Sequence, residues 1–174
     1  QRGALKKAGE ALAAGRFSRA RQALVKHLRH KRRRHPKQAR FLLAYADMRL
    51  KRYGEATAGF QALVPRYPLL ADYCRYYAAR SSYKAKRFAE ALGLARAVSA
   101  TATLAVDASL LQADALRALG RLPEALPLWR SYLRRRPGGA RAAEGHLRLA
   151  QAALKAVGAA SRPRVGGRAK LDEA

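Results

Sequence analysis

Gly15-Arg16-Phe17-Ser18-Arg19-Ala20 is the first of four related stretches, and together these stretches decide the fold. The other three are Lys51-Arg52-Tyr53-Gly54-Glu55-Ala56, Lys86-Arg87-Phe88-Ala89-Glu90-Ala91 and Gly120-Arg121-Leu122-Pro123-Glu124-Ala125. Each has an aromatic residue or Leu in its third position and an Ala three residues later. Four residues beyond that Ala come Leu24, Phe60, Ala95 and Trp129 in turn. The aromatic or Leu positions 17, 53, 88 and 122 lie 36, 35 and 34 residues apart. Such an interval is typical of stacked helical hairpins.

Each stretch is predicted to be a tight turn between two antiparallel helices. The aromatic residue would fill the gap between the helices, and the Ala would let them approach closely. Three second helices end before a proline, namely Pro36, Pro68 or Pro137, because proline cannot continue a helix. We predict helices at 2–14, 18–31, 38–51, 55–66, 69–85, 88–98, 103–119, 123–136 and 140–157. No stretch alternates in the manner of a strand. The predicted fold is all-α, a right-handed superhelix of about four hairpins with a C-terminal capping helix.

The predicted domain organisation follows this repeat. The helical domain covers residues 1–158, with repeats at about 1–36, 37–68, 69–102 and 103–137 and the capping helix at 140–157. Residues 159–174 contain Gly, Pro, Arg and Ser without periodicity. We therefore predict a flexible tail or linker there.

Composition narrows the possible classes of protein. The 174 residues carry 37 Lys and Arg against 11 Asp and Glu, a net charge of +26. A hydrophobic content of 49% argues against global disorder. The sequence has no run of about 18 apolar residues, so it predicts no membrane span. The lone Cys74 excludes an internal disulfide and a Cys-based zinc site. The chain begins at Gln1 rather than Met, so we expect a processed protein or a piece of a longer one.

Few residues are candidates for catalysis. Glu55, Glu90 and Glu124 occupy one equivalent repeat position, whereas a catalytic group would occur once. A carboxylate near a helix N-terminus is favoured by the helix dipole, and we interpret the three residues in that way. Cys74 lies in an apolar and aromatic stretch, which predicts a small buried residue rather than a reactive thiol. We predict no catalytic residue and no cofactor.

His27 and His30 could share a helical face and bind a metal. Their neighbours are cationic and would repel a metal ion, so we interpret them as surface histidines at a basic helix end and predict no metal site.

The stretch 26–37 holds seven Lys or Arg residues and three His. Its Lys and Arg residues are Lys26, Arg29, Lys31, Arg32, Arg33, Arg34 and Lys37. They could bind an anionic surface, or could simply be a solvated helix end that complements the helix dipole.

An aromatic stripe is the best candidate binding site. The stripe consists of Tyr73, Tyr76, Arg80, Tyr83 and Lys84, which fall on one helical face. The preceding repeat places Phe41, Tyr45, Met48 and Arg49 on the equivalent face. Tyr and Arg side chains suit a peptide or a sugar-containing polymer through stacking and hydrogen bonds. The alternative is that part of the stripe packs between hairpins, and a register shift of one residue would exchange Tyr76 for Tyr77.

The four turns resemble the tetratricopeptide repeat, and the resemblance covers residues 1–158. The first copy departs from the pattern by about four extra residues, and the third by Ala95 in place of a large residue. Membership of this family would imply a scaffold that binds a protein or peptide partner in a concave groove lined by the first helix of each hairpin.

A narrower resemblance rests on Tyr67-Pro68-Leu69-Leu70-Ala71-Asp72-Tyr73 and Tyr76-Tyr77-Ala78-Ala79-Arg80. These residues are similar to the helical region that precedes the catalytic domain of bacterial soluble lytic murein transglycosylases. That family cleaves peptidoglycan with a Glu followed by Ser, and no Glu of this chain precedes a Ser. The resemblance therefore implies a non-catalytic accessory domain in the periplasm or cell envelope, with a peptidoglycan strand as a possible partner.

Three functions remain open from the sequence. The first is the accessory domain of a transglycosylase-like protein, and the second is a general scaffold for a peptide or protein. The third is a nucleic-acid-associated repeat protein, which only the net charge supports. No recognised nucleic-acid module is present, and no aromatic residue interrupts 26–37 to stack on bases. A nucleic-acid partner is therefore the least favoured, and a cytoplasmic location stays open.

Overall fold

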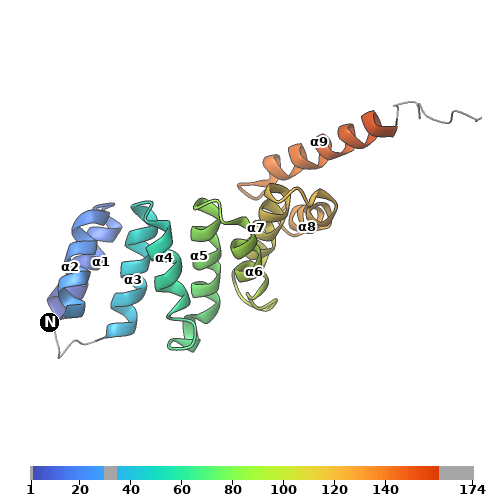
Figure 1. Ribbon diagram of the computed structural model, residues 1–174. Helices are drawn as coiled ribbons and strands as arrows, with labels where there is room; N and C mark the ends of the chain where they lie inside the picture. Colours follow the sequence, from blue (N-terminus) through green and yellow to red (C-terminus); the bar gives the residue numbers. More distant parts are fainter. Residues whose placement is uncertain (1, 30–34, 161–174) are drawn as a thin grey trace, which may run out of the picture.

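The computed structural model describes residues 2–29 and 35–160 as a stack of helices (Figure 1). The helices are α1 (Arg2–Ala13), α2 (Phe17–Arg29), α3 (Pro36–Arg49), α4 (Tyr53–Gln61), α5 (Ala71–Lys84), α6 (Phe88–Arg96), α7 (Ala105–Ala118), α8 (Leu122–Arg135) and α9 (Ala142–Ala160). A single 3₁₀ turn, η1 (Pro68–Leu70), precedes α5. The described ranges contain no strand, and the all-α prediction is confirmed. Most of the predicted tail 159–174 lies outside the described residues.

The helices form two layers. Each helix packs against the next one in the chain, and α1, α3, α5 and α7 also contact their neighbours in that series. We call these four helices the first-helix layer. Helices α2, α4, α6 and α8 form the second layer, each packed against the helix before it and the helix after it, and they follow one another along the stack in Figure 1. Four hairpins are therefore stacked side by side, as the repeat predicts.

The repeated stretches are the turns of these hairpins. Phe17, Tyr53, Phe88 and Leu122 are each the first residue of a second helix. The Ala three residues later is fully buried in every copy, at Ala20, Ala56, Ala91 and Ala125. The residues four positions further on are also buried, at Leu24, Phe60, Ala95 and Trp129. The close helix packing predicted at the four Ala positions is confirmed.

One backbone geometry recurs at all four turns. The residue two positions before the aromatic or Leu has a positive φ, of 71° at Gly15, 62° at Lys51, 62° at Lys86 and 76° at Gly120. In each turn the following Arg donates its backbone N–H to the carbonyl five residues earlier, as Arg87 does to Ser82 at 2.9 Å. This is the Schellman ending of a helix, which favours glycine because a side chain is strained at positive φ. Two of the four turns nevertheless use lysine.

Replacing Lys86 with Gly is expected to raise the free energy of unfolding by about 0.5–1 kcal/mol, because strain relief outweighs the extra freedom of Gly in the unfolded chain. Urea unfolding measures the change. Ala58, which is exposed within α4, serves as the control of opposite sign. Ala58→Gly should lower stability by a similar amount. A lower stability for Lys86→Gly would contradict the assigned turn geometry.

The second hairpin ends earlier than predicted. Helix α4 stops at Gln61 rather than 66, because the ring of Pro65 would clash with the carbonyl of Gln61 in a continued helix. The chain then turns through 62–66, and the N–H of Tyr67 bonds to the carbonyl of Leu63 at 2.7 Å. The predicted helix 69–85 accordingly begins as η1 and becomes α-helical only at Ala71.

Helix α9 leaves the stack. Its first turn packs on α8, where Ala142 is buried and Gly145 lies so close that an added Cβ would be 3.2 Å from Leu133 Cδ2. Leu147 and Leu154 further along are 54% and 73% exposed. Figure 1 shows α9 pointing away from the other helices. The first part of the predicted capping helix, as far as Leu149, therefore packs on the stack, while Leu154 beyond it is exposed.

Candidate functional site

The eight predicted groove residues lie around three pockets on the first-helix layer. Phe41, Tyr45 and Tyr73 line the first, which we call the aromatic pocket. Tyr76, Arg80, Tyr83 and Lys84 line the second, the mixed-charge pocket. Arg49 lines the third, the basic pocket, together with Arg80 and Lys84. The predicted stripe is thus divided between pockets rather than joined in one surface.

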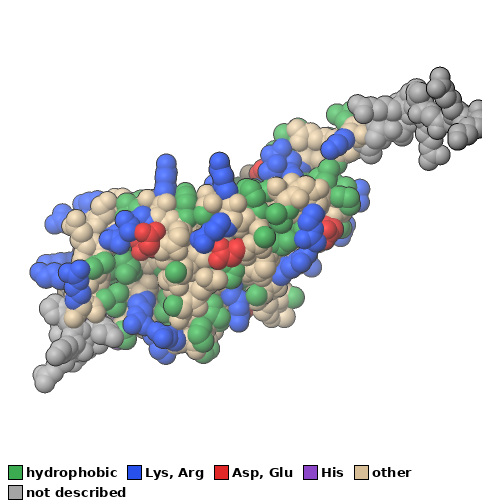
Figure 2. Space-filling model, viewed as in Figure 1, with side chains coloured by type: hydrophobic (Ala, Val, Ile, Leu, Met, Phe, Trp, Pro, Cys, Tyr) green, Lys and Arg blue, Asp and Glu red, His purple; other side chains and the backbone are tan. Residues whose placement is uncertain are grey.

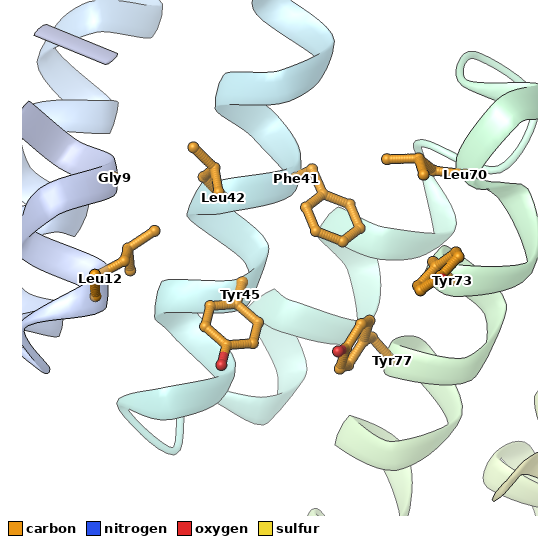
Figure 3. Close-up of a pocket in the computed structure, with 9 residues that line it drawn as sticks. Gly9, Leu12, Phe41, Leu42, Tyr45, Leu70, Tyr73 and Tyr77 are labelled. Carbon is orange, nitrogen blue, oxygen red and sulfur yellow. The ribbon is translucent and has the colours of Figure 1, made fainter. Parts of the chain in front are cut away.

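The aromatic pocket has a volume of about 530 Å³. Its lining comes from three consecutive hairpins and consists of Gly9, Leu12, Ala13, Phe41, Leu42, Tyr45, Leu70, Tyr73 and Tyr77. Figure 3 shows Leu12 approaching from α1, Phe41, Leu42 and Tyr45 from α3, and Tyr73 and Tyr77 from α5. Leu70 belongs to η1, so the turn created by Pro68 supplies one wall. No single hairpin could form this pocket.

Tyr77 is the centre of the aromatic cluster, although it was expected only under a shifted register. Its ring centroid lies 5.5 Å from that of Phe60, 6.2 Å from Phe41 and 6.0 Å from Tyr45. Burial raises the pKa of its hydroxyl. Tyr76, on the adjacent position, faces the mixed-charge pocket instead. Both tyrosines therefore line pockets, on neighbouring faces of α5, and their ring centroids lie 5.5 Å apart.

Two hydroxyl groups of the aromatic pocket are available to a ligand. Among the described residues, the hydroxyls of Tyr73 and Tyr77 make no hydrogen bond, whereas Tyr45 Oη accepts one from Arg49 Nη1 at 3.1 Å. Tyr73 is 37% exposed. The pocket thus combines an apolar interior with polar groups, an arrangement that can fix the orientation of a bound segment.

The mixed-charge pocket, of about 500 Å³, contains acidic residues that the sequence prediction missed. Asp107 and Asp114 come from α7, while Arg141 immediately precedes α9 and Glu144 lies in its first turn. The repeat interval could have located the first two. Asp107 and Asp114 stand 34 residues after Tyr73 and Arg80, at equivalent positions of the next repeat.

Every carboxylate of the mixed-charge pocket is paired with arginine. Asp114 is 4% exposed and lies 2.8 Å from Arg141 Nη2, which also contacts Glu144 at 2.8 Å. Burial raises the pKa of Asp114, opposed by the charge of Arg141, while the hydrogen bond from Arg141 lowers the pKa of Glu144. Asp107 pairs with Arg136 at 3.2 Å. Arg141 therefore links α9 to α7.

The basic pocket is smaller, at about 190 Å³. Its lining consists of Met48, Arg49, Lys51, Tyr53, Arg80 and Lys84, with no carboxylate. Neither Lys51 nor Tyr53 was predicted to line the groove. Arg80 and Lys84 form no ion pair within the described ranges. The positive charge of Arg80 and Lys84 at this end of the first-helix layer is therefore not neutralised by an ion pair among the described residues.

The predicted basic patch is described only in part. Lys31, Arg32, Arg33 and Arg34 lie outside the described residues. Lys26 and Arg29 are exposed in the last turn of α2. Lys37 is exposed at the start of α3, and its Nζ lies 6.0 Å from the ring centroid of Tyr67. Binding of an anionic surface by the basic patch stays a prediction.

The three repeated glutamates are ion-paired with arginine. Each has an Arg three residues earlier, with distances of 2.6 Å for Arg52–Glu55, 3.2 Å for Arg87–Glu90 and 2.7 Å for Arg121–Glu124. Figure 2 shows the same tendency, since the Asp and Glu side chains visible on this face lie beside Lys or Arg. These carboxylates stabilise hairpin turns.

Cys74 is completely buried, and burial raises its pKa to about 11. The thiol is therefore un-ionised at neutral pH and unsuited to nucleophilic attack, as predicted.

His27 corrects the prediction of a surface histidine. It is 5% exposed, because it continues the inward-facing row of α2 that includes Ala20 and Leu24. His30 lies outside the described residues.

Within the described part of the chain, no cluster of His, Cys, Asp and Glu could hold a metal ion. No helix there is both long enough and apolar enough to cross a membrane.

Comparison with known proteins places this architecture in a family. The family model of the tetratricopeptide repeat matches residues 5–71, 76–140 and 110–161. A solved structure described as "MamA RS-1 ArsTM double mutant" superposes with a TM-score of 0.68 at 17% sequence identity. That likeness covers 89% of this chain and 95% of the other. No curated protein matches the sequence. Neither likeness supports the predicted relationship to lytic transglycosylases. The matched residues extend over most of the sequence, and the chain belongs to the tetratricopeptide-repeat family.

Proposed function

We propose that the chain is a protein-interaction scaffold that binds a peptide segment of a partner protein across the first-helix layer. The aromatic pocket is the observation that carries this proposal. At about 530 Å³ it falls within the size range of ligand pockets. Because three hairpins contribute to it, an occupant would contact the repeats as a unit.

The lining suits a peptide side chain. Tyrosine rings offer a large contact area with few rotatable bonds, and their hydroxyls can bond to a peptide backbone. Tyr77 makes edge-to-face contacts with both Phe41 and Tyr45, so ordering these rings costs little on binding. The side chains that could perform chemistry are otherwise engaged, since the carboxylates of the adjoining pocket are ion-paired and Cys74 is buried.

A peptidoglycan strand in the cell envelope is the second candidate ligand. The stretch Tyr67–Tyr73 resembles that of transglycosylase accessory domains, and Tyr73 within it lines the aromatic pocket with an exposed ring. A sugar ring could stack on such a surface.

Filling the aromatic pocket is expected to weaken binding strongly without unfolding the protein. Gly9 lies within α1 and lines the pocket, and a Cβ built there meets no atom within 4 Å. Gly9→Leu should therefore occupy the pocket while improving helix propensity. Peptides selected from a random display library on the unmodified protein should bind Gly9→Leu about tenfold or more weakly by fluorescence anisotropy.

Gly3→Leu is the matched control, since Gly3 is exposed in the same helix, has open space and does not line the pocket. It should leave binding unchanged. Equal affinity of Gly9→Leu and the unmodified protein would refute the proposal. If no peptide were selected, and Gly9→Leu bound soluble peptidoglycan fragments more weakly than the unmodified protein did, the glycan would be favoured as the ligand instead.

A further inference from the structure

We infer that the aromatic and basic pockets form one composite site, which recognises a peptide with an acidic side chain near an apolar one. The inference rests on the proposed function and specifies the partner's chemistry. The apolar side chain would enter the aromatic pocket, and the carboxylate would meet the cations of the basic pocket.

The two pockets are neighbours along α3. Tyr45 lines the aromatic pocket and Arg49 the basic pocket. The residues are one helical turn apart, a rise of about 6 Å, and the hydrogen bond from Arg49 Nη1 to Tyr45 Oη joins them at 3.1 Å. Side chains a few positions apart in one peptide can therefore reach both pockets.

The cations of the basic pocket lack acidic partners. Arg49, Lys51, Arg80 and Lys84 form no ion pair among the described residues. Arg80 and Lys84 are four residues apart on α5, a spacing at which like charges repel. The carboxylates that share the mixed-charge pocket with them are already paired with Arg136 or Arg141. An incoming carboxylate would relieve this repulsion.

Charge also argues against a second copy of the chain as the occupant. Two molecules that each carry +26 would repel one another. A partner segment with Asp or Glu is attracted instead, and its apolar side chain distinguishes it from a polynucleotide, whose charge lies on a continuous backbone. An acidic peptide is therefore the occupant that both pockets fit.

Lys51 allows charge to be tested separately from folding. It occupies the positive-φ position of its turn, at 62°, so Lys51→Gly removes a cation while relieving backbone strain. Lys86 has the same φ and is also exposed, but it does not line the basic pocket. Lys86→Gly is therefore a control with the same loss of charge and the same change in the turn.

The test uses dodecapeptides selected from a random display library and synthesised with amidated C-termini. We expect Asp and Glu to be enriched beside an apolar residue, compared with the starting library. Lys51→Gly should weaken binding about threefold, and Arg80→Gln with Lys84→Gln about tenfold. Lys86→Gly, and Arg134→Gln with Arg135→Gln on the exposed end of α8, should change it little. Urea unfolding should show Lys51→Gly to be at least as stable as the unmodified protein.

The outcomes separate the two claims. Selected peptides that lose affinity for Gly9→Leu but show no acidic enrichment would overturn this inference and leave the proposed function standing. An equal loss of affinity in the Arg134 and Arg135 control would also overturn it, because net charge alone would then explain the attraction. Tighter binding of a single-stranded oligonucleotide than of any selected peptide would have the same effect. If no peptide were selected, both claims would fail.

Discussion

Trp129→Ala is expected to lower the free energy of unfolding by about 3–5 kcal/mol, the largest effect of any substitution considered. Trp129 is 1% exposed and is the largest fully buried side chain among the described residues. It packs with Leu110, Leu116 and Leu133 in the cluster between α7 and α8. Truncation would leave a cavity that helices fixed on both sides cannot close. Urea unfolding followed by circular dichroism measures the loss.

Trp129→Phe is the appropriate control, because it keeps an aromatic ring in the site and should cost clearly less. The effect should also be local, since each repeat contacts only its neighbours in such a stack. Amide hydrogen exchange should accelerate in α7, α8 and α9 before it does so in α1 and α2. A loss below about 1 kcal/mol would contradict the assigned packing.

Arg141→Gln is expected to have the second-largest effect and to detach α9 from α7. The substitution leaves the buried carboxylate of Asp114 without its partner at 2.8 Å. Breaking a fully buried ion pair costs about 3–5 kcal/mol, but the Arg141 side chain is 41% exposed. Solvent screening reduces the expected cost to about 2 kcal/mol. Hydrogen exchange in α9 and urea unfolding at pH 7 report the two consequences.

The cost of Arg141→Gln should depend on pH in a defined direction. Burial raises the folded-state pKa of Asp114, so its contribution to stability is greatest when it is protonated and falls as pH rises through that pKa. Arg141 opposes the rise, and its removal moves the folded pKa higher still. The stability lost in Arg141→Gln should therefore be smaller near pH 4 than at pH 7.

Asp114→Asn supplies the check on this explanation. In the Arg141→Gln background it removes the unpaired charge and should recover much of the lost stability at pH 7. A deficit that stays the same from pH 4 to pH 7, or a double variant that is no more stable than Arg141→Gln, would rule out the unpaired carboxylate as the cause.

The repeat made the fold predictable from sequence. The same small residue returns at the same place in every repeat, and it is buried between helices each time, at Ala20, Ala56, Ala91 and Ala125. Each copy therefore supports the interpretation of the other three. The predicted end of α4 was wrong because the predicted helix ran through Pro65. The steric clash of a proline within a helix is a local effect, so it could have been recognised from the sequence. His27 was misjudged because the charged neighbours concealed the apolar row to which it belongs.

The candidate site was less predictable, because its pockets depend on how hairpins meet. Tyr76 and Tyr77 are adjacent in sequence, and the packing of α5 against α3 and α7 decides which pocket each one lines. Repeat spacing identifies Asp114 as the equivalent of Arg80, but its pairing with Arg141 depends on where α9 begins. Periodicity thus predicts which face a residue occupies, while the partners on that face come from tertiary packing.

The most direct test of the binding proposal is to locate a selected peptide on the protein. Backbone amide chemical shifts of the isotopically labelled protein can be followed by NMR as peptide is added. We predict that the largest changes fall on α1, α3 and α5, at and around Gly9, Tyr73 and Tyr77, and that Gly9→Leu removes them. Largest changes on the exposed faces of α2, α4, α6 and α8, unaffected by Gly9→Leu, would contradict the account.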